Sequence, residues 1–366
     1  TTGADNTAMG GNSLYTNSTG NFNVASGYAS LRLNTTGSSN VGLGYESLKS
    51  NTTASSNTAV GYQAGYSNTT GAENVLVGYK AGYSSTTGNG LTAVGRQALE
   101  DNTASNNTAL GFAVMSNNTT GGFNTALGGA NYGFTGGAMH NNTTGSYNTA
   151  LGNQALHGNT TASECTAVGY QAGHTGNAEQ GTFIGKDSGK LVTGVKNTFV
   201  GAGSGNSVTS GDRNTILGRY NGNQGGFDCR TRSNHIVLSD GDGNPRLQID
   251  DDGNIKVPQV TSNTTGNSAN MHITSSGEFA KSTSSLRYKN TVTVATHGLT
   301  ELLTLRPVTY KGNNDGDTVF GGLIAEEVHD AGLTEFVMYN DDGEPDALAY
   351  SNMVSLCIKA IQEQQA

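Results

Sequence analysis

The sequence has no tryptophan, and proline, cysteine and charged residues are all scarce. Its 366 residues include four prolines and three cysteines, and only 13% of them are charged. The cysteines, Cys165, Cys229 and Cys357, lie far apart without CxxC spacing, which argues against a disulfide framework or a cysteine zinc site. We therefore expect three small buried apolar side chains here, with no metal and no other cofactor.

Proline is missing from the first 218 residues altogether. All four prolines, Pro245, Pro258, Pro307 and Pro345, follow that point. Nothing in residues 1–218 therefore interrupts a backbone hydrogen-bond ladder. This shift in composition predicts a domain boundary near residue 218.

Long apolar runs and basic patches are absent as well. No apolar run approaches the roughly 20 residues that a membrane-spanning helix needs, so no membrane insertion is expected. The 19 basic and 28 acidic residues give a net charge of −9. Because no basic stripe is present, nucleic acid is not expected as a partner.

What the sequence has in abundance is glycine, at 54 positions, together with a short motif that recurs every 16 or 17 residues. One longer step, from Gly128 to Gly152, indicates a seven-residue insertion around Tyr132 to Gly137. A fixed period of this kind predicts one structural coil per repeat. The copies of the motif are NTAMG (6–10), NVASG (23–27), NVGLG (40–44), NTAVG (57–61), NVLVG (74–78), LTAVG (91–95), NTALG (107–111), NTALG (124–128), NTALG (148–152), CTAVG (165–169), GTFIG (181–185), NTFVG (197–201) and NTILG (214–218).

The residue before the last glycine of each motif, here called the marker glycine, is apolar in twelve of thirteen copies, as in Leu43, Val60 and Leu110. We predict that this column faces either the coil interior or the axis of an oligomer. A small residue three places after the glycine is also expected to face inward. A second block, N-T-T-G or a close variant, follows many marker glycines by ten residues and supplies turn residues.

One apolar and one small residue per coil make a thin core. Such a core would hardly offset the backbone entropy of ordering so many glycines, which costs roughly 1–2 kcal/mol per residue. Three chains packed along a common axis would supply the missing buried surface. We therefore expect a mainly β protein whose residues 1–218 form the β-solenoid shaft of an elongated parallel homotrimer.

Two further columns of the repeat carry rings. The first follows the marker glycines and would either pack coil on coil or offer a glycan-stacking surface. The second is expected to stack as a solvated ladder in preference to binding a metal. The first column includes Tyr45, Tyr62, Tyr79, Phe112 and Tyr170, and the second is His140, His157 and His174.

Residues 219–283 keep β character but lose the period. Segments 235–258 and 270–282 alternate apolar and polar residues around turn dipeptides, which predicts two hairpin-like units forming a β neck. Five aspartates in the first segment lie in DG and DDGN contexts that favour turns, because the ligand spacing of a calcium loop is missing. They are Asp240, Asp242, Asp250, Asp251 and Asp252.

From Ser284 the composition changes to that of a small α+β domain, residues 284–366. Its last helix has an apolar face suited to packing against other protomers. That face carries Met353, Leu356, Cys357, Ala360 and Ile361. The expected elements are a helix at 298–305, a strand at 306–311, a strand and helix within 321–332, a hairpin within 334–350 and the final helix within 350–366.

The repeat and the C-terminal region each resemble known proteins. The repeat, which covers about 60% of the chain, is similar to the left-handed parallel β-roll of trimeric autotransporter adhesin heads and to repeats of phage tail fibres. The C-terminal motifs resemble, in order, the intramolecular chaperone of phage endosialidases and tail fibres, a family shared with some eukaryotic membrane-bound transcription factors. These motifs are SSLRYK (284–289), LRPVTYK (305–311), GGLIAEEV (321–328), DGEPDALAYSNM (342–353) and IKAIQEQ (358–364).

In that chaperone family a Ser-Asp-x-Arg-x-Lys segment cleaves its own chain just before the serine, once the domain has trimerised. The resemblance implies Ser284 and Lys289 as the catalytic dyad and Thr283–Ser284 as the cleaved bond. Arg287 belongs to the supporting motif, and Ser285 stands where the family has aspartate, which bears on whether cleavage occurs. A serine hydroxyl needs a base, and a lysine whose pKa is lowered by burial serves as one near neutral pH.

The expected function is therefore that of a structural trimeric tail fibre of a phage virion, involved in host adhesion. Its C-terminal domain would drive trimerisation and registration and then cleave itself off before Ser284, with no external substrate. The expected partners are two further copies of the chain, other virion fibre or baseplate proteins, and a host-surface glycan or protein. The chain would be assembled in the host cytoplasm and located in the virion.

Three alternatives remain. The chain is a bacterial adhesin at the cell surface, or a passive fibre spacer with an uncleaved chaperone. A polysaccharide depolymerase is disfavoured, because glycosidases need two carboxylates roughly 5–10 Å apart, and the acidic residues of the repeats are scattered without a clear pairing.

Overall fold

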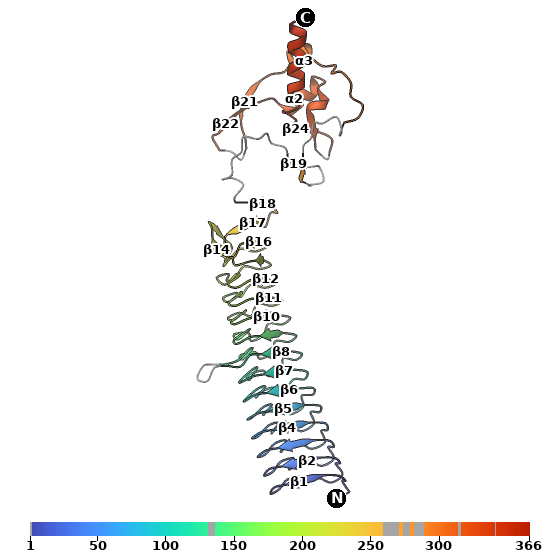
Figure 1. Cartoon of the computed structure of the whole chain (residues 1–366), viewed down its shortest axis with the longest axis vertical. Coiled ribbons are helices and arrows are strands. Elements are labelled where there is room, and N and C mark those ends of the chain that lie inside the picture. Colours follow the sequence, from blue (N-terminus) through green and yellow to red (C-terminus); the bar gives the residue numbers. More distant parts are fainter. Residues whose placement is uncertain are drawn as a thin grey trace. The chain divides into compact units, whose positions relative to one another are not determined.

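The chain divides into two compact units, residues 1–265 and 266–366, which are described separately here. In Figure 1 the first unit runs from blue to yellow and the second is orange to red. The computed structural model describes residues 2–130, 136–258, 289–313, 316–340 and 342–366, and the backbone of two strands at 271–273 and 279–281.

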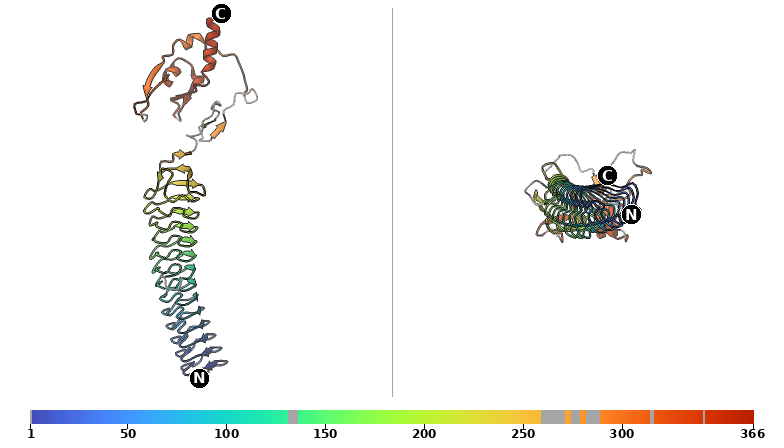
Figure 2. Two further views of the ribbon diagram at one scale, coloured as in Figure 1. Left: turned by 60° about the vertical axis from the view of Figure 1, so that its left-hand side comes forward. Right: turned by 90° about the horizontal axis from the view of Figure 1, so that it is seen from below.

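The first unit is a parallel β-solenoid, a stack of coils that each contribute a three-residue strand to one sheet (Figure 1, Figure 2). Each strand pairs in parallel with the next along the chain, so that Thr58 lies opposite Val75. Every strand falls on a copy of the glycine-ended motif, which confirms the predicted solenoid with one coil per repeat. The strands are β1 (Thr7–Met9), β2 (Val24–Ser26), β3 (Val41–Leu43), β4 (Thr58–Val60), β5 (Val75–Val77), β6 (Thr92–Val94), β7 (Thr108–Leu110), β8 (Thr125–Leu127), β9 (Thr149–Leu151), β10 (Thr166–Val168), β11 (Thr182–Ile184), β12 (Thr198–Val200) and β13 (Thr215–Leu217).

Only the middle residue of each strand points into the coil. Ala59 and Ile216 occupy middle positions and are fully buried, whereas Leu43 and Leu110, which precede marker glycines, are 36% and 43% exposed. Of the two alternatives for this column, the coil interior is therefore wrong. Successive strand side chains point to opposite faces, so the first and third residues share the outer face. The small residue three places after the glycine is buried as predicted, as in Ala64.

The large side chain that fills the coil interior comes from one of two positions. Where one position supplies it, the other holds a small residue. Leu48 occupies the position four residues after its marker glycine, and Gly65 occupies the same position one coil later, where Leu76 fills the space from the following strand. A Cβ on Gly65 would lie 2.8 Å from Leu76 Cδ1 and 2.9 Å from Leu48 Cδ2. Phe183 takes the space left by Gly173 in the same way, with a hypothetical Cβ 2.8 Å from its ring. Packing of this kind keeps the coil interior filled along the stack.

A buried column of asparagine satisfies backbone groups at one corner of the coil. Asn51 Nδ2 donates to Asn34 Oδ1 at 2.8 Å and to the Ala54 carbonyl at 3.0 Å. Asn68 repeats the pattern one coil further, donating to Asn51 Oδ1 at 2.9 Å. These are the asparagines of the N-T-T-G block, so the block supplies a ladder inside the coil as well as a turn.

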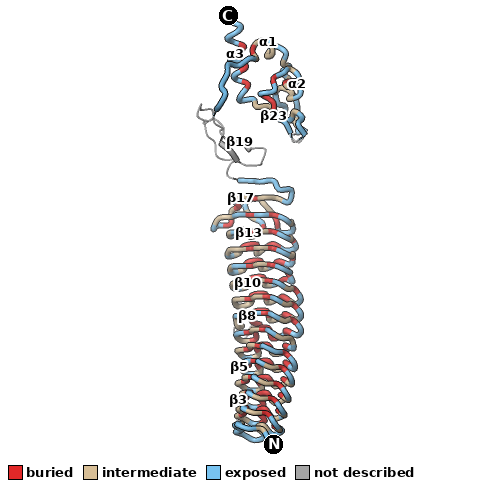
Figure 3. Tube along the Cα trace, turned by 90° about the vertical axis from the view of Figure 1, so that its right-hand side faces the viewer, coloured by how far each residue is buried: buried red, intermediate tan, exposed pale blue. Residues whose placement is uncertain are grey.

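A second buried column comes from the asparagine that begins the glycine-ended motif. Asn57 Oδ1 accepts a bond from the Asn74 backbone N–H at 3.0 Å, while Asn57 Nδ2 donates to the Gly71 carbonyl at 2.9 Å. Each such side chain thus joins its own coil to the next. Figure 3 shows the buried positions, in red, recurring from coil to coil.

The 24-residue step between marker glycines does not disturb the stack. Strands β8 and β9 pair in register, with Thr125 opposite Thr149. Asn142 Nδ2 donates to Asn118 Oδ1 at 2.7 Å, so the first asparagine column also continues across the step. The predicted insertion is thus accommodated between two in-register coils, although its Tyr132 end lies outside the described residues.

The sheet continues beyond residue 218, where the repeat motif ends. A further strand, β16 (Ile236–Ser239), pairs in parallel with β13. Two antiparallel strands, β17 (Pro245–Ile249) and β18 (Ile255–Lys256), then close the sheet. The small hairpin of β14 (Asn223–Gln224) and β15 (Phe227–Asp228) precedes β16.

Both hairpins predicted for the neck are confirmed. The first is the antiparallel pair β16 and β17 within 235–258. The second, which belongs to the second unit, is β19 (Met271–Ile273) paired with β20 (Phe279–Lys281). The predicted division into domains at residues 218 and 283 itself stays a prediction.

The rest of the second unit is the predicted small α and β region. Its core includes Val328, Leu333, Phe336 and Leu356. Within the described residues, no helix is both long and apolar enough to cross a membrane. The elements are α1 (Leu299–Leu302), β21 (Val308–Lys311), β22 (Val319–Gly322), α2 (Ala325–Asp330), a 3-10 turn (Thr334–Phe336), β23 (Val337–Tyr339), β24 (Pro345–Leu348) and α3 (Val354–Gln364), each within or beside its predicted segment.

The apolar face predicted for the last helix is divided between the interior of the unit and its surface. Met353 and Leu356 pack into the unit's own core, with 7% and 1% of their surface exposed, so the prediction that they pack against other protomers is wrong. Ile361 is 54% exposed and remains available. One side of the helix packs within the unit, because a helix of this length and a unit of this size both depend on that packing for stability.

The cysteines follow the same division. Cys165 and Cys229 are buried in the solenoid, as predicted, whereas Cys357 is exposed on α3. The prediction for Cys357 is wrong because its neighbour Leu356 takes the inward position on the helix.

Candidate functional site

The predicted self-cleavage site lies almost wholly outside the described residues. Ser284, Ser285, Arg287 and the Thr283–Ser284 bond all belong to the undescribed segment 282–288. Lys289 is described and is exposed. The pairing of Ser284 with Lys289 therefore stays a prediction.

The sheet of the solenoid has an outer apolar face, defined here as the first and third residues of strands β1 to β13. None of these 26 positions, two on each of thirteen strands, carries a charged side chain. The first positions hold threonine or valine, and the third hold valine, leucine, isoleucine or methionine in all strands except β2. Strand β16 continues the face with Ile236 and Leu238, which are 40% and 37% exposed. An uncharged strip of this length marks an interaction surface.

The second unit also exposes many large apolar side chains for its size. They lie on the segment that leads into α1, on the β21–β22 hairpin and along α3. Val294 and Leu303 are 83% and 75% exposed, and Val354, Ile358 and Ile361 on α3 are each more than half exposed. Residues spaced by three or four positions share one side of a helix, so these three form an apolar strip.

The rings that follow the marker glycines stack on one another. Tyr28, Tyr45, Tyr62 and Tyr79 form a continuous stack with centroid separations of 5.5, 5.3 and 5.2 Å. The Arg96 guanidinium extends the stack, 5.5 Å from the Tyr79 ring centroid. The rings therefore do pack coil on coil, yet they remain more than 40% exposed, so both uses predicted for this column remain compatible with it.

The three histidines stack as predicted. Ring centroids are 5.7 Å apart between His140 and His157 and 5.2 Å apart between His157 and His174. Burial lowers the pKa of His174, and the neighbouring His157 and Lys190 lower it further. Protonation of His174 at acid pH is therefore unfavourable in the folded chain.

The aspartates of segment 235–258, here called the cap because it closes the sheet, form turns, as predicted. Asp250 accepts bonds from the Asn254 side chain and backbone N–H, at 3.1 and 2.8 Å, and these hold its pKa below the usual range. Within the described residues, Asp250, Asp251 and Asp252 are the only three metal-ligating side chains close enough to share an ion. Such acidic groups on an exposed turn are common without a metal and do not define a site.

Several acidic residues of the solenoid pair with basic or amide groups. Glu46 accepts bonds from Lys49 Nζ at 2.6 Å and Gln63 Nε2 at 2.8 Å. Burial opposes ionisation of Glu46, but these bonds outweigh it and hold its pKa below the usual range. This is the environment of a structural carboxylate, since a catalytic acid needs a raised pKa.

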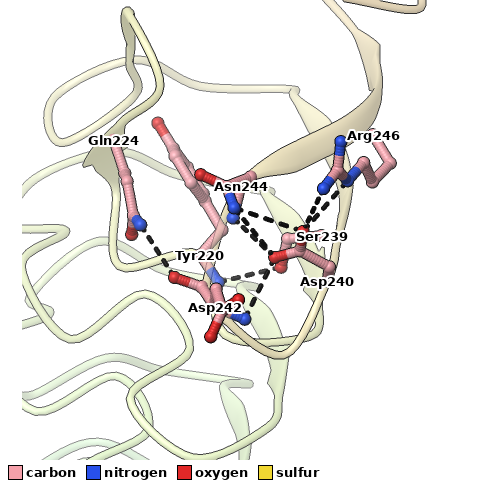
Figure 4. Close-up of polar contacts among 7 residues, drawn as sticks. All are labelled: Tyr220, Gln224, Ser239, Asp240, Asp242, Asn244 and Arg246. Carbon is pink, nitrogen blue, oxygen red and sulfur yellow. Dashed lines mark hydrogen bonds and ion pairs between the residues drawn. The ribbon is translucent and has the colours of Figure 1, made fainter. Parts of the chain in front are cut away.

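A polar network joins the cap to the last coils (Figure 4). Asp240 accepts backbone N–H bonds from Asp242 at 3.0 Å and Asn244 at 2.9 Å, and a side-chain bond from Arg246 Nε at 3.0 Å. The bond from the Asn244 N–H contributes most to lowering the pKa of Asp240. Gln224 Nε2 donates to the Asp242 carbonyl at 2.8 Å. This network borders a cavity of about 430 Å³ that the sequence did not reveal.

Sequence reasoning thus resolved one of these two surfaces only in part and missed the other. The outer apolar face was identified by its residues but left between two orientations, because period-2 alternation does not say which side is the coil interior. The cavity had no sequence signal, since residues as far apart as Lys186 and Asp242 are brought together only by stacking.

Comparison with protein-family models, with curated proteins and with solved structures found no match. The resemblances to adhesin heads, tail fibres and their chaperone therefore rest on the sequence motifs alone.

Proposed function

We propose that this chain is a structural fibre protein of a phage virion that works as a homotrimer. In this proposal the solenoid is the shaft and mediates host attachment. The C-terminal unit drives trimerisation, sets the register of the three chains and then cuts itself off before Ser284. The observation that carries the proposal is the uncharged outer apolar face of the solenoid sheet, which a single chain leaves uncovered.

The energetic case rests on repetition along the sheet. Complete burial of one valine or leucine side chain stabilises by about 1.5–3 kcal/mol. Leu110, Leu127 and Leu217 are still 42–43% exposed in the single chain, so each coil has part of that gain left to make. Even a fraction of it, added over thirteen strands, exceeds the entropic cost of association, which is estimated at about 4–15 kcal/mol.

A second copy of the same chain is the partner that fits this face best. The strip has one composition from β1 to β13, so its partner needs an equally long and equally spaced strip. Three chains packed in parallel around one axis would meet that condition with identical surfaces. Cyclic assembly of this kind is the usual arrangement of homo-oligomers.

Repetition creates a register problem that the second unit would solve. Chains slipped by one coil would still match apolar residues with apolar residues, so many registers are close in energy. The second unit is not repetitive, and it exposes its own apolar strip on α3. A unit that trimerises in one way only would fix the register before the shaft closes.

Self-cleavage would follow assembly for an electrostatic reason. Lys289 is exposed in the single chain. Burial between protomers would disfavour its charged form and make it a base for Ser284. Loss of the second unit would then remove a route by which the chain ends separate, and the shaft would persist by kinetic stability.

The trimer is tested by measuring the mass of the full chain with light scattering. For the wild type we expect three times the mass of the full chain, or of residues 1–283 once cleavage has occurred. For the double variant Leu110→Glu, Leu127→Glu we expect a monomer or soluble aggregate. The matched control is Thr120→Glu, Thr144→Glu, which adds the same charge at exposed positions outside the strands and should remain trimeric. A monomeric, folded wild type would sink the proposal.

Cleavage is tested separately by mass spectrometry of the assembled protein. The wild type should yield a fragment that ends at Thr283, and Ser284→Ala and Lys289→Ala should preserve the full chain without loss of trimer. Ser285→Ala is the control, and if it alone blocks cleavage, Ser285 is the nucleophile. An uncut wild-type trimer would leave the C-terminal unit as a retained chaperone.

A further inference from the structure

A polar cavity opens at the end of the column that follows the marker glycines. In most coils this column carries a large side chain. In the last four coils its residues are Tyr170, Lys186, Ala202 and Arg219, so Ala202 is the one small residue among them. Ala202 supplies no ring, and the next residue is Gly203. The cavity of about 430 Å³ is lined by both of these small residues. It is thus explained by a local loss of side-chain volume.

The walls of the cavity carry charges of both signs. Lys186 and Arg219 supply two cations, and Asp187 and Asp242 supply two carboxylates. Because these charges balance, an anion such as phosphate meets repulsion as well as attraction. A ligand without net charge fits this lining better.

The remaining polar groups narrow the ligand class. Asn206, Asn221 and Gln224 line the cavity with side-chain amides. An apolar ligand would exclude water from these groups and from the charged ones without offering them hydrogen bonds, which is costly. A hydroxyl group both donates and accepts, so it can bind a carboxylate, an ammonium or an amide. The lining therefore suits a ligand with many hydroxyl groups.

Asp187 contributes a carboxylate to the wall. Its Oδ1 atom is buried, and Lys190 Nζ lies 3.4 Å from it, close enough to balance its charge. The side chain as a whole is 22% exposed, so Oδ2, 3.9 Å from Lys186 Nζ, is the oxygen that faces a ligand. A ligand hydroxyl would donate to Oδ2.

One side of the cavity is held in place before any ligand binds. Gln224 and Asp242 are joined directly by a hydrogen bond, and Asp240 fixes the turn that carries Asp242 (Figure 4). Tyr220 N–H donates to Ser239 Oγ at 2.9 Å and ties the last coil to β16. Preorganised walls reduce the conformational entropy that the protein loses when a ligand binds.

An exposed aromatic ring belongs to the coil next to the one that carries Asp187. Tyr170 is 46% exposed, and its carbonyl accepts the Asp187 N–H at 2.8 Å, so the two residues lie on adjacent coils. Sugar rings have an apolar face of C–H groups as well as hydroxyl groups. A tyrosine ring one coil from a polar cavity offers surface for that face when the glycan is longer than one unit.

We propose that this cavity is a saccharide-binding site that takes one or two units of a neutral glycan. Its volume falls in the range of ligand sites, about 300–1,000 Å³. None of its lining residues belongs to the outer apolar face, so the proposed trimer and the proposed site use different residues. The site deepens the proposed function and rests on it for its meaning, because an attachment fibre needs a contact with host glycans.

The test is saturation-transfer NMR on the full chain with glucose, galactose, N-acetylglucosamine and lactose, each at millimolar concentration. The wild type should give a signal with at least one of these sugars. Ala202→Tyr, which refills the column, should abolish the signal, and Arg219→Gln should weaken binding about tenfold. Arg96→Tyr places the same ring in the same column far from the cavity and should leave binding unchanged.

Thermal unfolding and light scattering on the same samples separate the outcomes. A folded, trimeric wild type that binds none of these sugars would overturn the site and leave the fibre proposal standing. Sugar binding that persists in a folded Ala202→Tyr variant would also overturn it, as would binding of inorganic phosphate in place of sugars. A monomer that binds sugar and loses it with Ala202→Tyr would support the site and contradict the trimer.

Discussion

The two units of this chain use their residues in opposite ways. The solenoid repeats one solution thirteen times, with apolar side chains and hydrogen-bonded asparagine amides inside most coils. The second unit uses each element once, around a small core of residues such as Val328 and Leu356. Repetition makes the first unit easy to extend but leaves its alignment with other chains ambiguous. The second unit has no such translational symmetry.

Removal of the second unit, residues 266–366, should change the assembly of the chain more than any other variant considered below. Without it the shafts have no single favoured register, so we expect most of the protein to form mixed-length aggregates in place of a uniform trimer. Light scattering and electron microscopy of the two forms would measure this. If the truncated shaft assembles into uniform trimers from the unfolded chain at the wild-type yield, the solenoid sets its own register.

The interior and the outer face of the solenoid should respond differently to loss of a leucine. Leu99 is fully buried within one chain, so Leu99→Ala should lower the free energy of unfolding by about 2–5 kcal/mol. Leu110→Ala, on the outer face, should instead weaken the trimer and make the melting temperature depend on protein concentration. Denaturant unfolding at two concentrations distinguishes them, and equal concentration dependence would contradict the distinction.

The buried asparagine columns should contribute more to the stability of the fold than their polar side chains suggest. Asn118 Nδ2 donates to the Gly121 carbonyl at 2.8 Å, and Asn118 Oδ1 accepts from Asn142 at 2.7 Å. Asn118→Ala leaves these buried partners unpaired and should cost about 1–3 kcal/mol per chain. Thr120→Ala, at an exposed position of the same coil, is the control for chemical denaturation and should change stability little.

Acidification should give the smallest effect. The folded state lowers the pKa of His174 by burial and by the neighbouring charges of His157 and Lys190, opposed by Asp187. The unfolded chain then binds the proton more readily, so stability is full above the unfolded pKa of about 6.5 and falls as pH decreases below it. The melting temperature should drop modestly between pH 7 and pH 5, and less so in His174→Gln. A pH dependence that is unchanged in this variant would assign the effect to other groups.

Much of the solenoid could be predicted because the same pattern recurs thirteen times. The arrangement of one coil per repeat followed from the spacing of the marker glycines, and the stacking of the histidines followed from their spacing. The orientation of residues such as Leu43 could not be settled, because alternation is symmetric between the two faces of a strand. Burial by the partner chain and burial by the coil leave the same apolar signature.

The predictable part of the functional sites was smaller. The dyad of Ser284 and Lys289 came from a resemblance, and no described geometry tests it. The cavity was missed because Lys186, Arg219 and Asp242 belong to different coils and turns. Their convergence depends on stacking, which no local motif encodes. The division of the apolar face of α3 between the core of the unit and its surface was missed as well. An apolar pattern does not say how much of a helix face packs within its own unit.

The reversal of direction at the end of the sheet has a consequence for polymerisation. A parallel solenoid presents an open edge onto which another strand can add, as in an amyloid fibril. Here β17 runs antiparallel to the stack and β18 pairs antiparallel with β17. The edge strand β18 is only two residues long, contains Lys256 and is soon followed by Pro258. Short, charged edges next to proline discourage further pairing. At this end, therefore, the number of coils is set by the length of the chain and not by how many molecules are present.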